Sequence, residues 1–273
     1  MSDALEVTIL GSGSSGGVPR LGGPGGKGDW GACDPGNPKN RRSRCSVLVR
    51  RRQGGGETTV LVDTSPDMRN QLLMAGCGHL DAVLITHNHA DQTHGLDDIR
   101  AICYASRRKL DLYADRRSLD GLFGRFGYVF ETPNGSLYPP IAAAHEIAPL
   151  KGFEITGTGG AIPVLPFWQE HGNFGALGFR FGPVAYSSDV SDLSEESFAA
   201  LEGIDLWILD ALRYTAHPTH INVETALKWI ARIKPRHAVL TNLHIDLDYE
   251  TLKRELPPGV EPAYDGLVVR AAI

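Results

Sequence analysis

The sequence predicts an α/β (α+β) fold in which two β-sheets pack together and helices lie outside them. Short apolar runs typical of strands recur in both halves of the chain, and segments with helical spacing of apolar residues lie between them. Two β-rich halves that are each flanked by helices are typical of packed sheets with outer helices. No stretch resembles a linker, so we expect a single domain over residues 1–273.

The first half begins with a strand and a long loop. A Gly- and Pro-rich stretch from residue 11 to about residue 40 has too few apolar residues for a core element and predicts a loop. Ser65 is a plausible N-cap, Pro66 suits the first helical position, and Gly76 suits the end of that helix. The apolar spacing predicts a further helix over 97–107, a hairpin turn at 54–56, and strands at 5–10, 45–51, 58–63 and 81–86.

The second half repeats this pattern. Apolar runs predict strands at residues 162–167, 178–187, 206–209, 238–241 and 267–271. Helical spacing predicts helices at 195–201, 223–233 and 249–255. Both halves therefore supply strands and helices to the predicted sandwich.

Composition and charge exclude some classes of protein. The formal net charge is -5 and the pI is about 6.1, which argues against a general nucleic-acid binder. No run of about 18 apolar residues suggests a membrane span, and the N-terminus shows no secretory signal. The four cysteines form no CxxC pair, which favours free thiols. We therefore expect a cytoplasmic protein without a membrane partner.

Metal-binding chemistry is concentrated just after the apolar run at 82–85. His87, His89 and Asp91 alternate there, at the end of a predicted buried strand. A tight loop after a strand can direct such side chains toward one point. Imidazole and carboxylate are the usual ligands of zinc and related divalent ions. The pattern therefore predicts a metal site.

His87-x-His89-x-Asp91 followed by Gln92 resembles the HxHxDH signature of the metallo-β-lactamase superfamily. Further residues recur in the order of that family: Asp63, His171, Asp189 and His244. Residues 11–19 and Asp265-Gly266 are similar to the subgroup that contains the carbon–phosphorus lyase accessory phosphodiesterase. This resemblance implies a four-layer αββα sandwich of two mixed β-sheets.

The resemblance also implies two divalent metals, zinc or manganese. It assigns His87, His89 and His171 to the first metal, Asp189 to the bridging position, and His244 to the second metal with Asp91. Gln92 stands where the signature has its last histidine. Because an amide oxygen is a harder ligand than imidazole, the second site should be weaker, richer in oxygen, or empty. His94 could replace the missing histidine as a ligand of the second metal, but this is less favoured, because the helix that begins nearby should turn its side chain away from the site.

The subgroup resemblance favours a phosphodiesterase that cleaves a small nucleotide or sugar phosphodiester, cyclic ones included, with a metal-activated hydroxide. A leaving alkoxide needs a proton, and His220 is the first candidate for general acid, with His217 second. Either histidine could instead cap or pack the helix that follows. The expected catalytic residues are His220, Asp91 and His217, while Asp210 could orient a histidine or cap a turn.

Four positive charges in residues 39–44 suggest that Arg41, Arg42 and Arg44 bind the substrate phosphate, although such a run is usually a solvated face. Two other functions stay open. One is a tRNA 3′-processing nuclease, which would call for a basic arm that the sequence lacks. The other is a nucleotide-binding protein with a weakened second metal site. We expect no stable nucleic-acid partner, and the sequence leaves a homodimer open.

Overall fold

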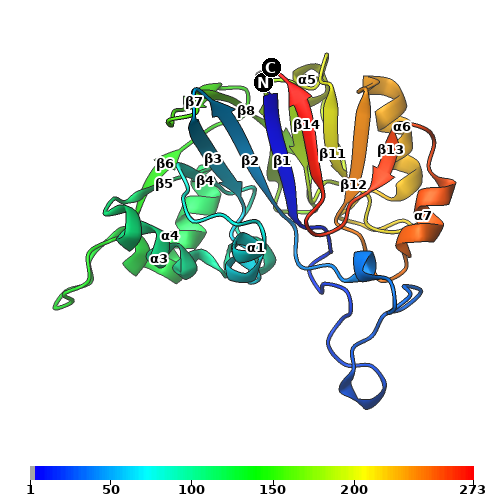
Figure 1. Ribbon diagram of the computed structural model, residues 1–273, viewed down its shortest axis with the longest axis horizontal. Coiled ribbons are helices and arrows are strands. Elements are labelled where there is room, and N and C mark those ends of the chain that lie inside the picture. The colour runs from blue at the N-terminus through cyan, green and yellow to red at the C-terminus, as the bar shows by residue number, and fades with distance from the viewer. Residues whose placement is uncertain (1–3) are drawn as a thin grey trace.

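The computed structural model describes residues 4–273; the first three residues, part of the segment from which a secretory signal was judged absent, lie outside the described residues. Across residues 4–273, two seven-stranded sheets lie against each other with helices on both outer sides (Figure 1). This arrangement confirms the predicted four-layer αββα sandwich. None of the helices in these residues is long and apolar enough to cross a membrane.

The first sheet is mixed. Its order is β14 (Val268–Ala272), β1 (Ala4–Gly11), β2 (Ser46–Gln53), β3 (Gly56–Val62), β4 (Ala82–Leu84), β5 (Leu110–Ala114) and β6 (Ala142–Glu146). Neighbours from β14 to β3 are antiparallel, and neighbours from β3 to β6 are parallel.

The second sheet has the same design. Its order is β13 (Val260–Pro262), β12 (His237–Thr241), β11 (Leu206–Asp210), β10 (Val184–Ser187), β9 (Ala176–Phe181), β8 (Ile162–Gln169) and β7 (Phe153–Ile155). Neighbours from β13 to β10 are parallel, and neighbours from β10 to β7 are antiparallel. Parallel strands end at the same edge of a sheet, so each sheet presents a row of strand ends.

Helices cover the outer faces of both sheets. The first sheet is covered by α1 (Met68–Met74), α3 (Ile99–Ser106) and α4 (Arg116–Phe130), and the second by α5 (Glu195–Ala200), α6 (Val223–Ile233) and α7 (Tyr249–Glu255). The four-residue helix α2 (Ala90–Thr93) follows the histidine loop. Short 3₁₀ helices lie at Pro24–Gly26, Pro38–Asn40 and Leu96–Asp98.

The core forms three layers because side chains alternate along the strands. Val47 and Val49 of β2 face the opposite sheet, whereas Leu48 between them packs with the residues under α1 and α3. Successive side chains of a strand point to opposite faces, so one apolar strand can serve two layers. An equivalent outer layer lies between the second sheet and its helices.

Two expectations about local structure need correction, and several elements were not predicted. Residues 178–187 form two strands, β9 and β10, because Gly182 adopts a φ of 55° at a turn between them. Helix α1 begins at Met68 with Asp67 as N-cap, later than expected, because residues 66–67 form a turn in which Ser65 Oγ accepts from the Asp67 amide at 3.1 Å. Strands β5, β6, β7 and β13 and helices α2 and α4 were not predicted.

Candidate metal centre and active site

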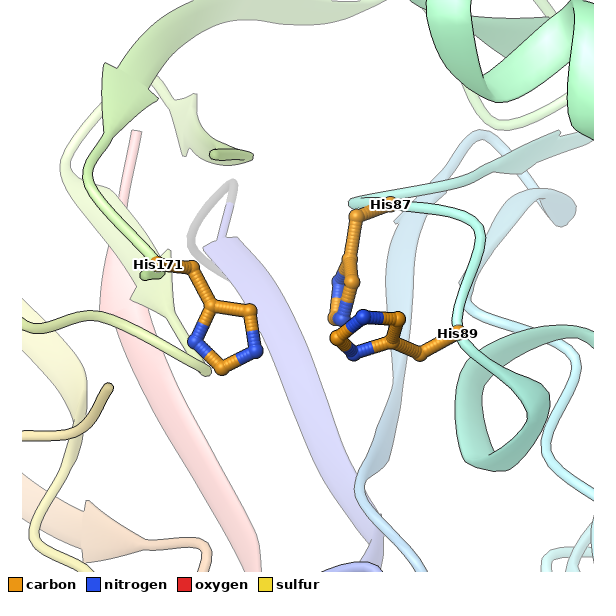
Figure 2. A group of neighbouring side chains, drawn as sticks. All are labelled: His87, His89 and His171. Atoms are coloured by element: carbon orange, nitrogen blue, oxygen red, sulfur yellow. The ribbon is translucent and has the colours of Figure 1, made fainter. Parts of the chain in front are cut away.

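Three histidines meet where the ends of β4 and β8 face each other. His87 and His89 follow β4, and His171 follows β8. The ring centroid of His87 lies 4.4 Å from that of His89 and 5.0 Å from that of His171. Figure 2 shows the three rings turned toward a common point. Each residue offers a nitrogen within 4.8 Å of the others, so the group could hold a metal ion.

Two of these rings are oriented by hydrogen bonds on Nδ1. His87 Nδ1 lies 3.0 Å from Thr86 Oγ1, and that hydroxyl lies 2.9 Å from an oxygen of the buried Asp63 carboxylate. With the hydroxyl donating to Asp63, His87 Nδ1 donates to the hydroxyl. His171 Nδ1 lies 2.8 Å from the carbonyl oxygen of Thr219 and donates to it. Both rings therefore present Nε2 to the shared space, as metal-ligating histidines do.

The donor set fits a divalent metal. His87 Nε2 is buried and has no hydrogen-bond partner among residues 4–273, although buried polar atoms are normally paired. Burial lowers the pKa of His87 to about 3, and burial also lowers the pKa of His89. Neutral imidazoles are the form that binds metal. His87, His89 and His171 therefore form a candidate metal site.

The neighbouring half of the site is built around Asp189, the second residue after the end of β10. One of its oxygens, Oδ2, accepts a 3.0 Å hydrogen bond from Gln92 Nε2, while Oδ1 lies 3.9 Å from His220 Nε2. Burial raises the pKa of Asp189, but the surrounding His87 and His220 outweigh burial and lower it. Burial, assisted by the Asp189 charge, raises the pKa of Asp91 to about 6. Both oxygens of Asp189 thus face protein donors.

His220 is held between two carboxylates. Its Nδ1 lies 2.8 Å from Oδ2 of Asp210, which is fully buried at the end of β11. Burial lowers the pKa of His220, but Asp210 and Asp189 outweigh burial and raise it to about 9. Asp210 therefore orients and charges this histidine, although its Oδ2 also accepts from the Val190 amide at 3.1 Å.

The structure brings His220, rather than His244, into a second group that could hold a metal, together with His171 and Asp189. His244 lines a cavity with Asp189, but its Nδ1 lies 2.9 Å from the Asp246 carboxylate. This differs from the ligand set that the family resemblance implied, because the loop after β12 provides its own acid for His244.

Two other histidines take different positions. His94 is exposed and packs edge-on against Phe126, with ring centroids 5.7 Å apart, so it does not replace the missing ligand at Gln92. His217 lies beside His220, with ring centroids 5.1 Å apart, and burial lowers its pKa. Its Nδ1 accepts from the Thr219 amide at 3.3 Å.

The basic segment at 39–44 does not form a free phosphate site. Arg42 is buried and donates to the carbonyl oxygens of Leu247 at 2.7 Å and His244 at 3.3 Å, which contradicts its predicted substrate contact. Arg44 is paired with Asp67 at 3.0 Å, and Arg41 lies over the Trp30 ring at 5.3 Å. Arg42 instead fixes the loop that carries His244.

The structure reveals site residues that the sequence did not single out. A polar cavity of about 300 Å³ beside Asp189 and His220 is lined by Ser14, Ser15, Arg20, Leu212 and Arg213, together with His217 and His244, which were expected from the sequence. The signal for the two serines was the resemblance of residues 11–19, in the Gly-rich loop after β1, to the phosphodiesterase subgroup. The two arginines carry no motif, because they reach the cavity through the fold.

The family follows from these observations and from a direct match. Residues 58–245 match the family model described as "Beta-lactamase superfamily domain". The chain belongs to the metallo-β-lactamase superfamily. Its strand-end histidines and paired mixed sheets agree with that membership, as the resemblance predicted.

Similar proteins narrow the family further. A solved structure described as "a New Diphosphatase from the PhnP Family" is 33% identical, covers 99% of this chain and 98% of its own, and has a TM-score of 0.86. This likeness agrees with the predicted subgroup of the carbon–phosphorus lyase accessory phosphodiesterase. Human tRNase Z, short form, shares the fold with a TM-score of 0.67 at 18% identity, covering 97% of this chain and 98% of its own.

A curated relative is the octanoyltransferase of Porphyromonas gingivalis (strain ATCC BAA-308 / W83), which is 36% identical over 268 residues. The alignment covers 96% of this chain and 51% of the relative, so the chain spans about half the length of that protein. Family, fold and histidine cluster together support a metal-binding hydrolase.

Proposed function

We propose that this chain is a phosphodiesterase that acts on a small nucleotide or sugar phosphodiester, with His220 as the general acid. The observation that carries this proposal is the Asp210–His220 pair, joined at 2.8 Å and placed beside the three-histidine cluster through Asp189. Asp210 holds Nδ1, so the opposite nitrogen of His220 faces the space where a substrate would lie. A charged imidazole there can protonate a leaving alkoxide.

The three-histidine cluster would hold a divalent metal, zinc or manganese. When bound, the metal supplies Lewis acidity to a phosphoryl oxygen and acidifies water. Thr86 and Asp63 keep the His87 ring in place, and the Thr219 carbonyl does the same for His171. The likeness to a PhnP-family diphosphatase supports phosphate-ester chemistry.

The second metal position fits less well, and we propose that it is weak. Gln92 already donates to one oxygen of Asp189, and His220 faces the other. His244 is engaged by Asp246. Two residues that the family resemblance assigned to the second metal, Asp189 and His244, thus already have partners within the protein.

The octanoyltransferase name of one relative suggests a different class of substrate, an acyl thioester. The cavity beside Asp189 argues against this class, because Leu212 is the one apolar residue among the described residues that line it. An eight-carbon chain would find little apolar surface there. The name also belongs to a protein of which this chain covers 51%.

The leaving-group dependence of a His220→Gln variant tests the proposal. A p-nitrophenolate leaves without a proton, whereas an alkoxide needs one. The variant should therefore lose about 100-fold or more in kcat on 2′,3′-cyclic nucleotides, whose leaving group is an alkoxide, and far less on bis(p-nitrophenyl) phosphate. The metal content should stay unchanged. His217→Ala tests the second candidate acid, and His145→Ala, which removes an exposed histidine paired with Asp111 at 2.7 Å, is the control.

Four results would oppose the proposal. Equal losses on both leaving groups would remove His220 as the acid, and loss of metal from His220→Gln would make this residue a ligand. Metal-loaded wild type that leaves bis(p-nitrophenyl) phosphate and 2′,3′-cyclic nucleotides uncut would exclude a phosphodiesterase, and binding without turnover would favour a nucleotide-binding protein.

A further inference from the structure

The cavity beside the catalytic pair extends beyond Asp189 and His220 to residues that the roles above do not use. Ser14 and Arg20 come from the loop after β1, and Arg213 comes from the segment before α6. At about 300 Å³ the cavity reaches the lower end of the range for small-molecule sites. These residues therefore form a polar extension of the active site.

Ser14 supplies a buried hydroxyl without a protein partner. Its side chain is 4% exposed, and within residues 4–273 its Oγ has no hydrogen-bond partner. Leaving a buried hydroxyl unpaired costs free energy, so buried polar atoms are normally satisfied. A hydroxyl of this kind in the wall of a polar cavity is placed to bond a ligand.

Arg20 supplies a positive charge that the protein leaves unused. In the part of the chain that the structure describes, its guanidinium has no hydrogen bond or ion pair, and its Nε is buried. The backbone beneath it is fixed, because Arg20 and Asp29 exchange two 2.9 Å hydrogen bonds and Val18 pairs with the buried Arg42. The fold thus holds this side chain at the cavity.

Arg213 adds a second positive charge to the same cavity. Its Nη2 donates to the carbonyl oxygen of Ala216 at 2.7 Å and its Nε to that of Thr215 at 3.3 Å, so the head group is held by neutral partners. Among the described residues that line the cavity, Asp189 is the one acid, and it faces His220 Nε2 at 3.9 Å. With two arginines and one carboxylate in its lining, the cavity has an excess of positive charge.

We propose that this extension binds a second phosphate group, so that the substrate is a phosphoanhydride such as a nucleoside diphosphate ester. Arginine guanidinium groups bind phosphate oxygens through charged hydrogen bonds, and a serine hydroxyl can donate to a further oxygen. The cavity is continuous with Asp189 and His220, so the second phosphate lies next to the phosphate that is attacked. This inference rests on the proposed phosphodiesterase function and specifies its substrate class.

A comparison of the affinities of the metal-loaded protein for ADP and for AMP isolates the contribution of the second phosphate to binding. By calorimetry at equal free metal, wild type should bind ADP about tenfold more tightly than AMP, because one charged contact contributes that much. Arg20→Ala should remove most of this preference and leave AMP binding unchanged. Arg69→Ala, an exposed arginine on α1, should keep the full preference.

Further variants keep the test decisive if Arg20→Ala does not fold, as judged by its melting curve. Ser14→Ala should reduce the preference about two- to fivefold, because a neutral hydrogen bond contributes less than a charged one. Equal binding of ADP and AMP by wild type, or an unchanged preference in these variants, would overturn the second phosphate site even if phosphodiesters are cleaved. An ADP preference that depends on Arg20 in a protein that cleaves no phosphodiester would keep this site and overturn the proposed function.

Discussion

The two halves of the site differ in whether their side chains already have hydrogen-bond or charged partners within the protein. In the half formed by His87, His89 and His171, each ring points a nitrogen into a common space, and His87 Nε2 has no partner among residues 4–273. In the other half, Gln92 and His220 both face Asp189. The same loop therefore leads into a cluster of potential ligand nitrogens on one side and a network of hydrogen bonds within the protein on the other.

This difference shows what a single residue changes. A histidine in place of Gln92 would offer a ring nitrogen, whereas the amide donates a hydrogen bond to Asp189 and offsets its negative charge locally. Asp189 is left with His220 as its charged neighbour, at 3.9 Å. We therefore propose a site with one firmly held metal and a proton-donating histidine opposite it.

Removing a histidine from the first half should have the largest effect. His89→Ala should reduce metal affinity more than about 100-fold and abolish turnover, since loss of a ligand exceeds the effect of losing a supporting residue. Metal content after dialysis, measured by mass spectrometry, checks this expectation. His94→Ala is the matched control, because His94 is exposed and packs on Phe126. Full metal content in His89→Ala would contradict the assignment of the metal to the half of the site that contains this histidine.

Disturbing the network of the second half should reduce turnover but spare the metal. Asp210→Asn keeps the shape of the buried side chain but weakens its hold on the His220 ring, so kcat on a dialkyl ester should fall about 10- to 100-fold. The loss on a p-nitrophenyl ester should be smaller if Asp210 acts through the general acid. A uniform loss on both esters would indicate a merely structural carboxylate.

Restoring the family residue sharpens the comparison further. Gln92→His should strengthen the second metal position about tenfold or more, because imidazole is the better ligand for zinc and the donor to Asp189 is removed. Metal titration followed by calorimetry would reveal the second binding step. Asn88→His adds a histidine to the same loop, where Asn88 packs toward Arg117, and should add no metal. An unchanged stoichiometry in Gln92→His would show that Gln92 is not what weakens the site.

The smallest effect concerns the support of the His244 loop. Asp248 caps α7 and accepts from Asn40 Nδ2 at 2.7 Å; burial raises its pKa, but the hydrogen bonds from Thr251 and Asn40 outweigh burial and lower it to about 2. Since the folded pKa is below the ordinary value of 3.8, this stabilisation is present above pH 4 and is lost as pH falls toward 2.

Asp248→Ala should therefore lower the free energy of unfolding by about 1 kcal/mol at pH 7, because the side chain is partly exposed and solvent screens its charge. Urea unfolding of wild type and variant from pH 7 to pH 3 measures the difference, which should shrink in acid. Asp248→Asn, which keeps an acceptor for the cap, should lose less. A difference that stays constant with pH would exclude the ionised carboxylate as the cause.

Much of the fold could be predicted because local signals and packing agree. Helices α6 and α7 match their predicted bounds, and Asn222 and Asp248 cap them as short polar side chains do. The histidine loop was recognisable since His87 and His89 follow an apolar strand directly. Residues 178–187 were mistaken for one strand because both runs are apolar and only the Gly182 turn divides them.

The remaining part of the site depends on contacts between distant segments. The basic run at 39–44 is typical of an exposed, charged surface, yet Arg42 is buried by the segments around it. Its guanidinium donates to the carbonyl oxygen of Leu247, which is 205 residues away in the sequence. Arg20 has no motif and reaches the cavity through the pairing of its loop with Asp29 and Arg42. The engagement of His244 by Asp246 depends on side-chain orientation, which residue spacing does not determine.

Anomalous diffraction from crystals grown with manganese tests the proposed asymmetry most directly. We predict one strong peak among His87, His89 and His171, with Gln92 still bonded to Asp189 and with His220 facing that carboxylate without binding a metal. Two peaks of equal height, with His244 turned from Asp246 to the second ion, would contradict the account.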